Sequence, residues 1–133
     1  MTPHCRKKQW LALLFTAVVI LILAGSLMPM AEIPEQEKTV WEKIMSVITN
    51  LMHVPMYGVL TLVSLYYFEC IRFSRPGGAV VSALIAMAVG VVVEVLQIYV
   101  PGRYGSFSDI GLNTVGMVGG IGVFFRIRRK TGG

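Results

Sequence analysis

Several ionisable and amide side chains lie in sequence that is otherwise apolar enough for a lipid bilayer. Such groups cost free energy at membrane depth, so they are the first candidates for function. Their types would supply a histidine base, a carboxylic acid, and an arginine that binds carboxylate or phosphate through two hydrogen bonds. The candidate polar site comprises His53, Tyr57, Glu94, Gln97, Arg103, Asp109 and Asn113.

The composition indicates a single integral membrane domain, residues 1–133. Hydrophobic residues make up 55% and charged residues 14% of the chain, and the mean hydropathy is +0.70. Soluble domains have about a quarter of their residues charged. The net charge of +5 does not indicate nucleic-acid binding, because the basic residues gather at the ends of apolar runs and no nucleic-acid-binding motif is present.

Four apolar runs approach the roughly 20 residues that a helix needs to span a bilayer. We therefore predict an all-α, polytopic membrane protein with four transmembrane helices, at about residues 9–30, 45–70, 79–100 and 108–126. The first run also fits a cleaved signal peptide, with small residues at 24–26. A retained span is favoured because the uncharged run continues past Ser26.

The basic residues predict the topology. Nine of the twelve Lys and Arg residues fall in the leader, the loop after the second run and the C-terminal tail, namely Arg6, Lys7, Lys8, Arg72, Arg75, Arg126, Arg128, Arg129 and Lys130. Positive segments stay inside, so both termini are expected to be cytoplasmic in a multi-pass protein of the plasma membrane. The acidic stretch 32–43 then lies outside, either as a solvated loop or with a short interfacial helix carrying Val40, Trp41 and Ile44.

Polar and small residues recur at helical spacing along three of the runs. Three stripes are evident: His53, Tyr57, Thr61 and Ser64; Ser82, Ala86, Gly90 and Glu94; and Asp109, Asn113, Gly116 and Gly120. The small residues Gly90, Gly116 and Gly120 predict close helix packing. In this interpretation the glycines join the third and fourth spans as a hairpin. Pro55 is a candidate kink in the second span.

The predicted topology brings these polar residues to the outer side of the membrane. Ser108 is a candidate N-cap of the fourth span, and Asp109 suits the positive end of that helix. Glu94 lies about 9 Å below the loop at 1.5 Å per residue. It therefore needs a partner, for which Arg103 and His53 are the two candidates.

The sequence resembles the VanZ-like family of bacterial membrane proteins over about residues 45–120. The resemblance rests on an ordered set of short motifs: His53-x-x-x-Tyr57, Glu94-x-x-Gln97, Pro101-Gly102-Arg103, Ser106-x-x-Asp109 and Asn113-x-x-Gly116. It implies an envelope protein linked to resistance to the glycopeptide teicoplanin. Family members often carry an Asp-Lys pair just before the histidine, whereas Thr49-Asn50-Leu51-Met52 stands there in this chain.

Three functional hypotheses follow. In the first, the outward polar site binds a lipid-linked cell-wall precursor or the glycopeptide itself, with Arg103 as the anion clamp. In the second, a membrane enzyme uses His53 as base and Glu94 as acid on a lipid-linked substrate. In the third, a proton-coupled carrier gains size by forming a homo-oligomer through Gly116 and Gly120. No nucleophile motif, cofactor motif or clustered metal ligands are present, so the expected partners are membrane lipids and these ligands.

Overall fold

A computed structural model of the chain describes residues 3–29, 37–103 and 106–131, which form five helices and no strand. The helices are α1 (Pro3–Ser26), α2 (Val40–Leu51), α3 (His53–Cys70), α4 (Arg75–Gln97) and α5 (Phe107–Lys130). The stretches long and apolar enough to cross a membrane are Lys7–Ser26, Val40–Cys70, Arg75–Gln97 and Phe107–Lys130. The prediction of an all-α protein with four transmembrane helices is therefore confirmed.

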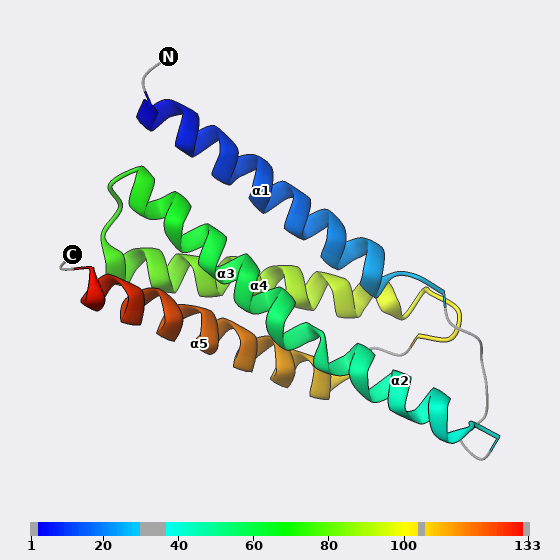
Figure 1. The fold of residues 1–133 in the computed structure, drawn as a ribbon. Coiled ribbons are helices and arrows are strands. Elements are labelled where there is room, and N and C mark those ends of the chain that lie inside the picture. The colour runs from blue at the N-terminus through cyan, green and yellow to red at the C-terminus, as the bar shows by residue number, and fades with distance from the viewer. Residues whose placement is uncertain (1–2, 30–36, 104–105, 132–133) are drawn as a thin grey trace.

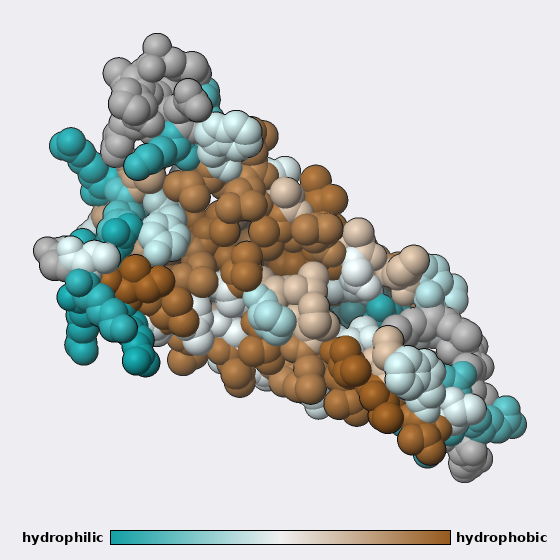
Figure 2. All heavy atoms as spheres, in the orientation of Figure 1, coloured by the Kyte–Doolittle hydropathy of each residue, from teal (hydrophilic) through white to brown (hydrophobic). Residues whose placement is uncertain are grey.

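The helices form an elongated bundle with two distinct ends (Figure 1). The start of α1, the α3–α4 connection and the end of α5 share one end, which we call the basic end because most of the basic residues belong to these segments. α2 and the α4–α5 connection lie at the opposite end, which we call the α2 end. Figure 2 shows hydrophilic residues at both ends and an apolar belt between them, as expected of a bilayer-spanning bundle.

The acidic stretch leads into a helix rather than continuing as a loop. Thr39 and Glu42 form a capping box, in which the Thr39 N–H donates to Glu42 Oε2 (2.7 Å) and the Glu42 N–H donates to Thr39 Oγ1 (3.3 Å). This box starts α2, so the solvated-loop alternative is wrong for residues 40–43. The expectation for residues 32–36 falls outside the described residues.

α2 and α3 form one interrupted helical segment. They meet at Met52, and α2 continues roughly in line with α3, beyond the other helices (Figure 1). Pro55 explains the interruption, since its ring has no N–H and clashes with the carbonyl of the residue four positions earlier, Leu51. The second apolar segment therefore begins at Val40 and has 31 residues, several more than the predicted span.

α3 is the central helix of the bundle and packs most closely on α5. A Cβ placed on Gly116 would lie 2.3 Å from the Val54 carbonyl oxygen, and one on Gly120 would lie 2.6 Å from the Gly58 carbonyl oxygen. Because only hydrogen fits at these points, the two backbones touch directly.

The close glycine contact corrects two expectations. Gly116 and Gly120 face α3, so they do not join α4 to α5 as the hairpin interpretation predicts. Both glycines are also buried within one chain, so they offer no free surface for a dimer. The sequence pattern identified the packing residues but not the helix that they meet.

Three helix ends differ from those predicted or have unusual caps. α1 ends at Ser26, short of residue 30. The N-cap of α5 is Ser106, not Ser108, and its hydroxyl accepts from the Ser108 N–H (3.1 Å). α3 ends with Arg72 at φ 61°, a position usually taken by glycine, and the Phe73 N–H reaches back to the Phe68 carbonyl (3.0 Å).

Candidate polar site at the α2 end

Six of the seven predicted site residues are buried together near the α2 end of the bundle. α3 contributes His53 and Tyr57, α4 contributes Glu94 and Gln97, and α5 contributes Asp109 and Asn113. Each of these side chains is at most 7% exposed. Figure 2 shows hydrophilic atoms recessed in the apolar flank near this end. Three helices therefore bring polar side chains together in one buried region. Packing of helices in lipid does not by itself require such a cluster.

His53 and Asn113 form the closest polar contact between α3 and α5. His53 Nδ1 lies 2.9 Å from Asn113 Oδ1. An amide oxygen only accepts hydrogen bonds, so Nδ1 carries the proton and donates it. In the neutral ring this leaves a lone pair on Nε2, which can accept a hydrogen bond or a proton. The contact thus fixes both the tautomer and the orientation of the imidazole.

Tyr57 and the amide end of Asn113 converge on Gly90. The Tyr57 ring is parallel to that of His53, with centroids 6.1 Å apart. A Cβ on Gly90 would lie 2.9 Å from Asn113 Nδ2 and 3.6 Å from the Tyr57 hydroxyl. Gly90 therefore makes room for these side chains, rather than for the backbone of a neighbouring helix.

The Glu94 carboxylate is held by the backbone that starts α5. Its Oε2 accepts a hydrogen bond from the Ser106 N–H at 2.7 Å. Glu94 also interacts electrostatically with Asp109 and His53. The main partner of Glu94 is thus a backbone amide, with His53 close enough to act on it through charge.

Arg103 does not fold back onto Glu94. Its guanidinium donates from Nε to the Met28 carbonyl (3.2 Å) and from Nη2 to the Gly25 carbonyl (3.0 Å). Gln97 Nε2 donates to the neighbouring Ser26 carbonyl (3.1 Å). The last carbonyls of a helix lack partners within the helix, so these two side chains cap α1 and attach it to the bundle.

Five buried atoms of the polar site have no hydrogen-bond partner among the described residues. They are Tyr57 Oη, Glu94 Oε1, Gln97 Oε1, Asp109 Oδ1 and Asn113 Nδ2. Native structures leave few buried polar atoms unpaired. Tyr57 Oη and Asn113 Nδ2 can donate a hydrogen bond, and the four oxygen atoms can accept one. Together they can bind a ligand group that both donates and accepts hydrogen bonds. No group of three or more His, Cys, Asp or Glu side chains among the described residues could hold a metal ion.

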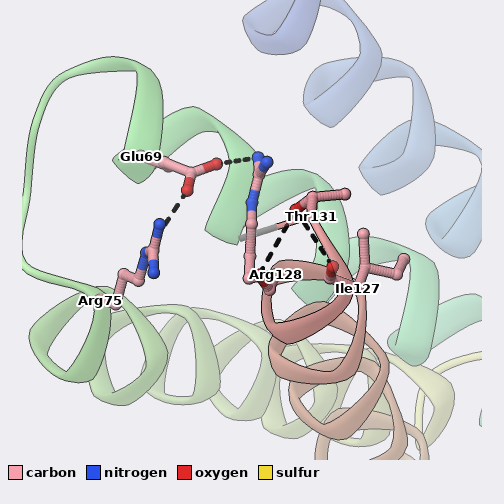
Figure 3. Close-up of polar contacts among 5 residues, drawn as sticks. All are labelled: Glu69, Arg75, Ile127, Arg128 and Thr131. Carbon is pink, nitrogen blue, oxygen red and sulfur yellow. Dashed lines mark hydrogen bonds and ion pairs between the residues drawn. The ribbon is translucent and has the colours of Figure 1, made fainter. Parts of the chain in front are cut away.

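A second charged cluster, at the basic end, was not identified from the sequence. Glu69 pairs with Arg75 (Oε1 to Nε, 3.6 Å) and with Arg128 (Figure 3). The Arg128 guanidinium also lies over the rings of Tyr66 and Phe124. The position of Glu69 at the end of its apolar run, three residues before Arg72, is the sequence signal that could have revealed this cluster, which links α3, α4 and α5.

The positions that carry an Asp-Lys pair in many VanZ-like proteins lie at the end of α2. Asn50 is exposed, and the Thr49 hydroxyl is bonded to the Met45 carbonyl of its own helix (2.8 Å). Neither side chain contributes to the five unpartnered atoms. The buried site is therefore built without that pair.

Comparison with known proteins agrees with the motifs. The model of the VanZ/LLP1 family matches residues 5–128, nearly the whole chain. No curated protein and no solved structure matches significantly. The match includes α2, α3 and α4 in full, nearly all of α1 and α5, and every residue of the polar site. The chain belongs to the VanZ/LLP1 family and is a multi-pass membrane protein.

Proposed function

We propose that this protein acts in the bacterial cell envelope by binding a hydroxyl- or amine-bearing group in the polar site at the α2 end. The observation that carries the proposal is the set of five unpartnered polar atoms from three helices. Unpaired buried atoms of this kind cost about 1–3 kcal/mol each. A ligand that satisfies them recovers part of that cost, which favours binding over a purely structural role.

The charges of the site favour particular ligands. Glu94 and Asp109 both bring carboxyl groups, while Arg103, expected as an anion clamp, already donates to the Gly25 carbonyl of α1 and to the Met28 carbonyl just beyond it. A carboxylate or phosphate would therefore meet like charge without a cationic partner. Sugar hydroxyls and amines fit better because they donate to carboxylates and amide oxygens. The sugar portion of a lipid-linked cell-wall precursor and that of a glycopeptide both have this chemistry.

The predicted topology places such a site where these ligands occur. The basic end is expected to lie in the cytoplasm of a plasma-membrane protein, which leaves the α2 end facing outside. The VanZ resemblance adds the link to teicoplanin resistance. Binding of the drug or of its precursor target at the outer face is one physical route to that phenotype.

Direct binding tests the proposal. The full chain in nanodiscs is titrated with teicoplanin and, separately, with a lipid-linked disaccharide precursor. We expect Glu94→Gln and Asp109→Asn to weaken binding about tenfold each, the factor for one charge-assisted hydrogen bond. The matched control is Glu37→Gln, which neutralises an exposed carboxylate. If the wild type binds neither compound yet confers resistance, or if the variants bind as tightly as the wild type, the proposal is wrong.

A second candidate function is catalysis on a lipid-linked substrate. The observation that favours it is the His53 tautomer, which leaves Nε2 able to take a proton beside a carboxyl group. Mass spectra of envelope lipids and peptidoglycan from expressing cells would then change for the wild type but not for His53→Gln. Unchanged profiles with resistance intact would exclude this function. No comparable observation favours the carrier hypothesis.

A further inference from the structure

A cavity lies between α1, α3 and α4, away from the polar site. Its volume is about 260 Å³, and its walls include Ala12, Phe15 and Thr16 of α1, Tyr67 and Phe68 of α3, and Ile85 of α4. In Figure 1, α1 runs alongside α3 and diverges from α4 and α5 toward its N-terminus. The cavity is several times larger than the volume of one water molecule, about 30 Å³.

The walls of the cavity offer few polar groups to a ligand. Three of its lining residues bear hydroxyls, namely Thr16, Ser64 and Tyr67, and the first two are satisfied within their own helices. The Thr16 hydroxyl donates to the Ala12 carbonyl (3.0 Å), and the Ser64 hydroxyl donates to the Leu60 carbonyl (2.8 Å). An empty space in a bilayer forfeits dispersion contacts with its lining. A hydrocarbon chain is the group that fits such a lining.

Positive side chains that have no ion-pair partner among the described residues lie at the same end of the bundle. Lys8 is four residues before Ala12, about 6 Å along α1. Arg72 lies two residues after the end of α3, the helix that contributes Ser64, Tyr67 and Phe68 to the cavity. Both side chains are exposed. Glu69, three residues before Arg72, is already paired with Arg75 and Arg128.

Arg72 holds an unfavourable backbone conformation at this place. Its φ of 61° lies in the left-handed region, where glycine is the usual residue at a helix C-terminus. The chain thus keeps a cation beside the cavity at a position where glycine would be less strained. A negatively charged group near Arg72 would complement it.

From these observations we propose that the α1–α3–α4 cavity binds one acyl chain of an anionic phospholipid, whose headgroup lies among the basic residues at Lys8 and Arg72. The lipid would fill the gap between α1 and the bundle. The ligand here is a resident lipid of the leaflet at the basic end, so this site is separate from the polar site at the α2 end.

Native mass spectrometry of the full chain, purified in detergent and titrated with phosphatidylglycerol or phosphatidylcholine of equal chain length, tests the proposal. Ala12→Phe fills the cavity, and the control Ala17→Phe adds the same side chain at an exposed position of α1 that is not part of the cavity lining. We expect Ala12→Phe to weaken phosphatidylglycerol binding about tenfold, the factor for two methylene groups. Ala17→Phe is expected to bind as the wild type does.

The headgroup is tested with Arg72→Gly, which removes the charge and relieves the positive φ, so folding is retained. The preference for phosphatidylglycerol over phosphatidylcholine should fall about fivefold, the factor for one basic residue at an anionic surface. Equal binding of the two lipids by the wild type would overturn the proposal. So would equal effects of Ala12→Phe and Ala17→Phe, which would indicate general coating of the apolar belt.

Discussion

The direct backbone contact between α3 and α5 makes a sharp prediction for Gly116→Ala. The added Cβ would lie 2.3 Å from the Val54 carbonyl oxygen and 3.1 Å from the Gly58 nitrogen. Carbon and carbonyl oxygen normally approach to about 3.3 Å, so the helices must separate locally by roughly 1 Å. Neither neighbour can rotate away, because both are backbone atoms.

The magnitude follows from this displacement. Overpacking of a tight contact costs about 1–3 kcal/mol. The His53–Asn113 hydrogen bond, 2.9 Å long, joins the same two helices one turn away. A further 1 Å would take it beyond the limit of about 3.5 Å, which removes about another 1 kcal/mol. The better helix propensity of alanine returns about 1 kcal/mol. The net expected loss in the free energy of unfolding is about 1–3 kcal/mol.

Gly119→Ala is the matched control on the same helix. A Cβ at Gly119 meets nothing within 4 Å, so this variant should gain about 1 kcal/mol. Reversible unfolding in mixed micelles, followed by circular dichroism, measures both values. Nitrogen NMR of the His53 ring reports whether its tautomer is still fixed. Equal stabilities of the two alanine variants, with an unchanged His53 signal in Gly116→Ala, would refute the reasoning.

Three further predictions concern the helix ends. Arg103→Lys should loosen the attachment of α1, because one ammonium group cannot reproduce the planar guanidinium that donates to two carbonyls. The distribution of spin-label distances between α1 and α4 should then broaden. An unchanged distribution would contradict the capping role of Arg103. Arg72→Gly should raise the free energy of unfolding by about 1 kcal/mol, because glycine adopts the positive φ of this position without strain. The same unfolding experiment in mixed micelles measures this value. A loss of stability would show instead that the Arg72 side chain makes a stabilising contact. Thr39→Ala should destabilise α2 by about 1 kcal/mol, because it breaks the capping box. The fluorescence emission maximum of Trp41 should shift as α2 frays. An unaltered emission spectrum would mean that α2 does not need its cap.

Much of the fold was predictable because the bilayer restricts the possible structures. Long uncharged runs have to be helices when no water is available to bond their backbone, so the number of spans followed from run length. The helical spacing of His53 and Tyr57, and of Asp109 and Asn113, also placed these residues on shared helix faces. The structure brings the six buried residues together in the same half of the bundle that the topology argument indicated.

Other features could not be predicted because they depend on which helices are neighbours. The pattern of Gly116 and Gly120 marks a close contact but carries no information about its partner, which is α3. Charge alone makes Glu94 a candidate partner of Arg103, whereas the acceptors in the structure are backbone carbonyls at and just beyond the end of α1. Such carbonyls are present at every helix end, so a sequence gives no reason to favour one of them.

The contact of His53 with Asn113 also determines the order in which the polar site can assemble. The two residues are 60 positions apart, and Asn113 lies on α5, which is synthesised after α3 and α4. While α3 and α4 enter the bilayer, α5 does not yet cover the face of α3 that later contacts Gly116 and Gly120. The polar atoms of Tyr57 and Glu94 are uncovered for the same reason. The site therefore cannot form span by span during translation. Its completion has to wait for the insertion of α5, which makes α5 the helix that commits this region of the chain to its native structure.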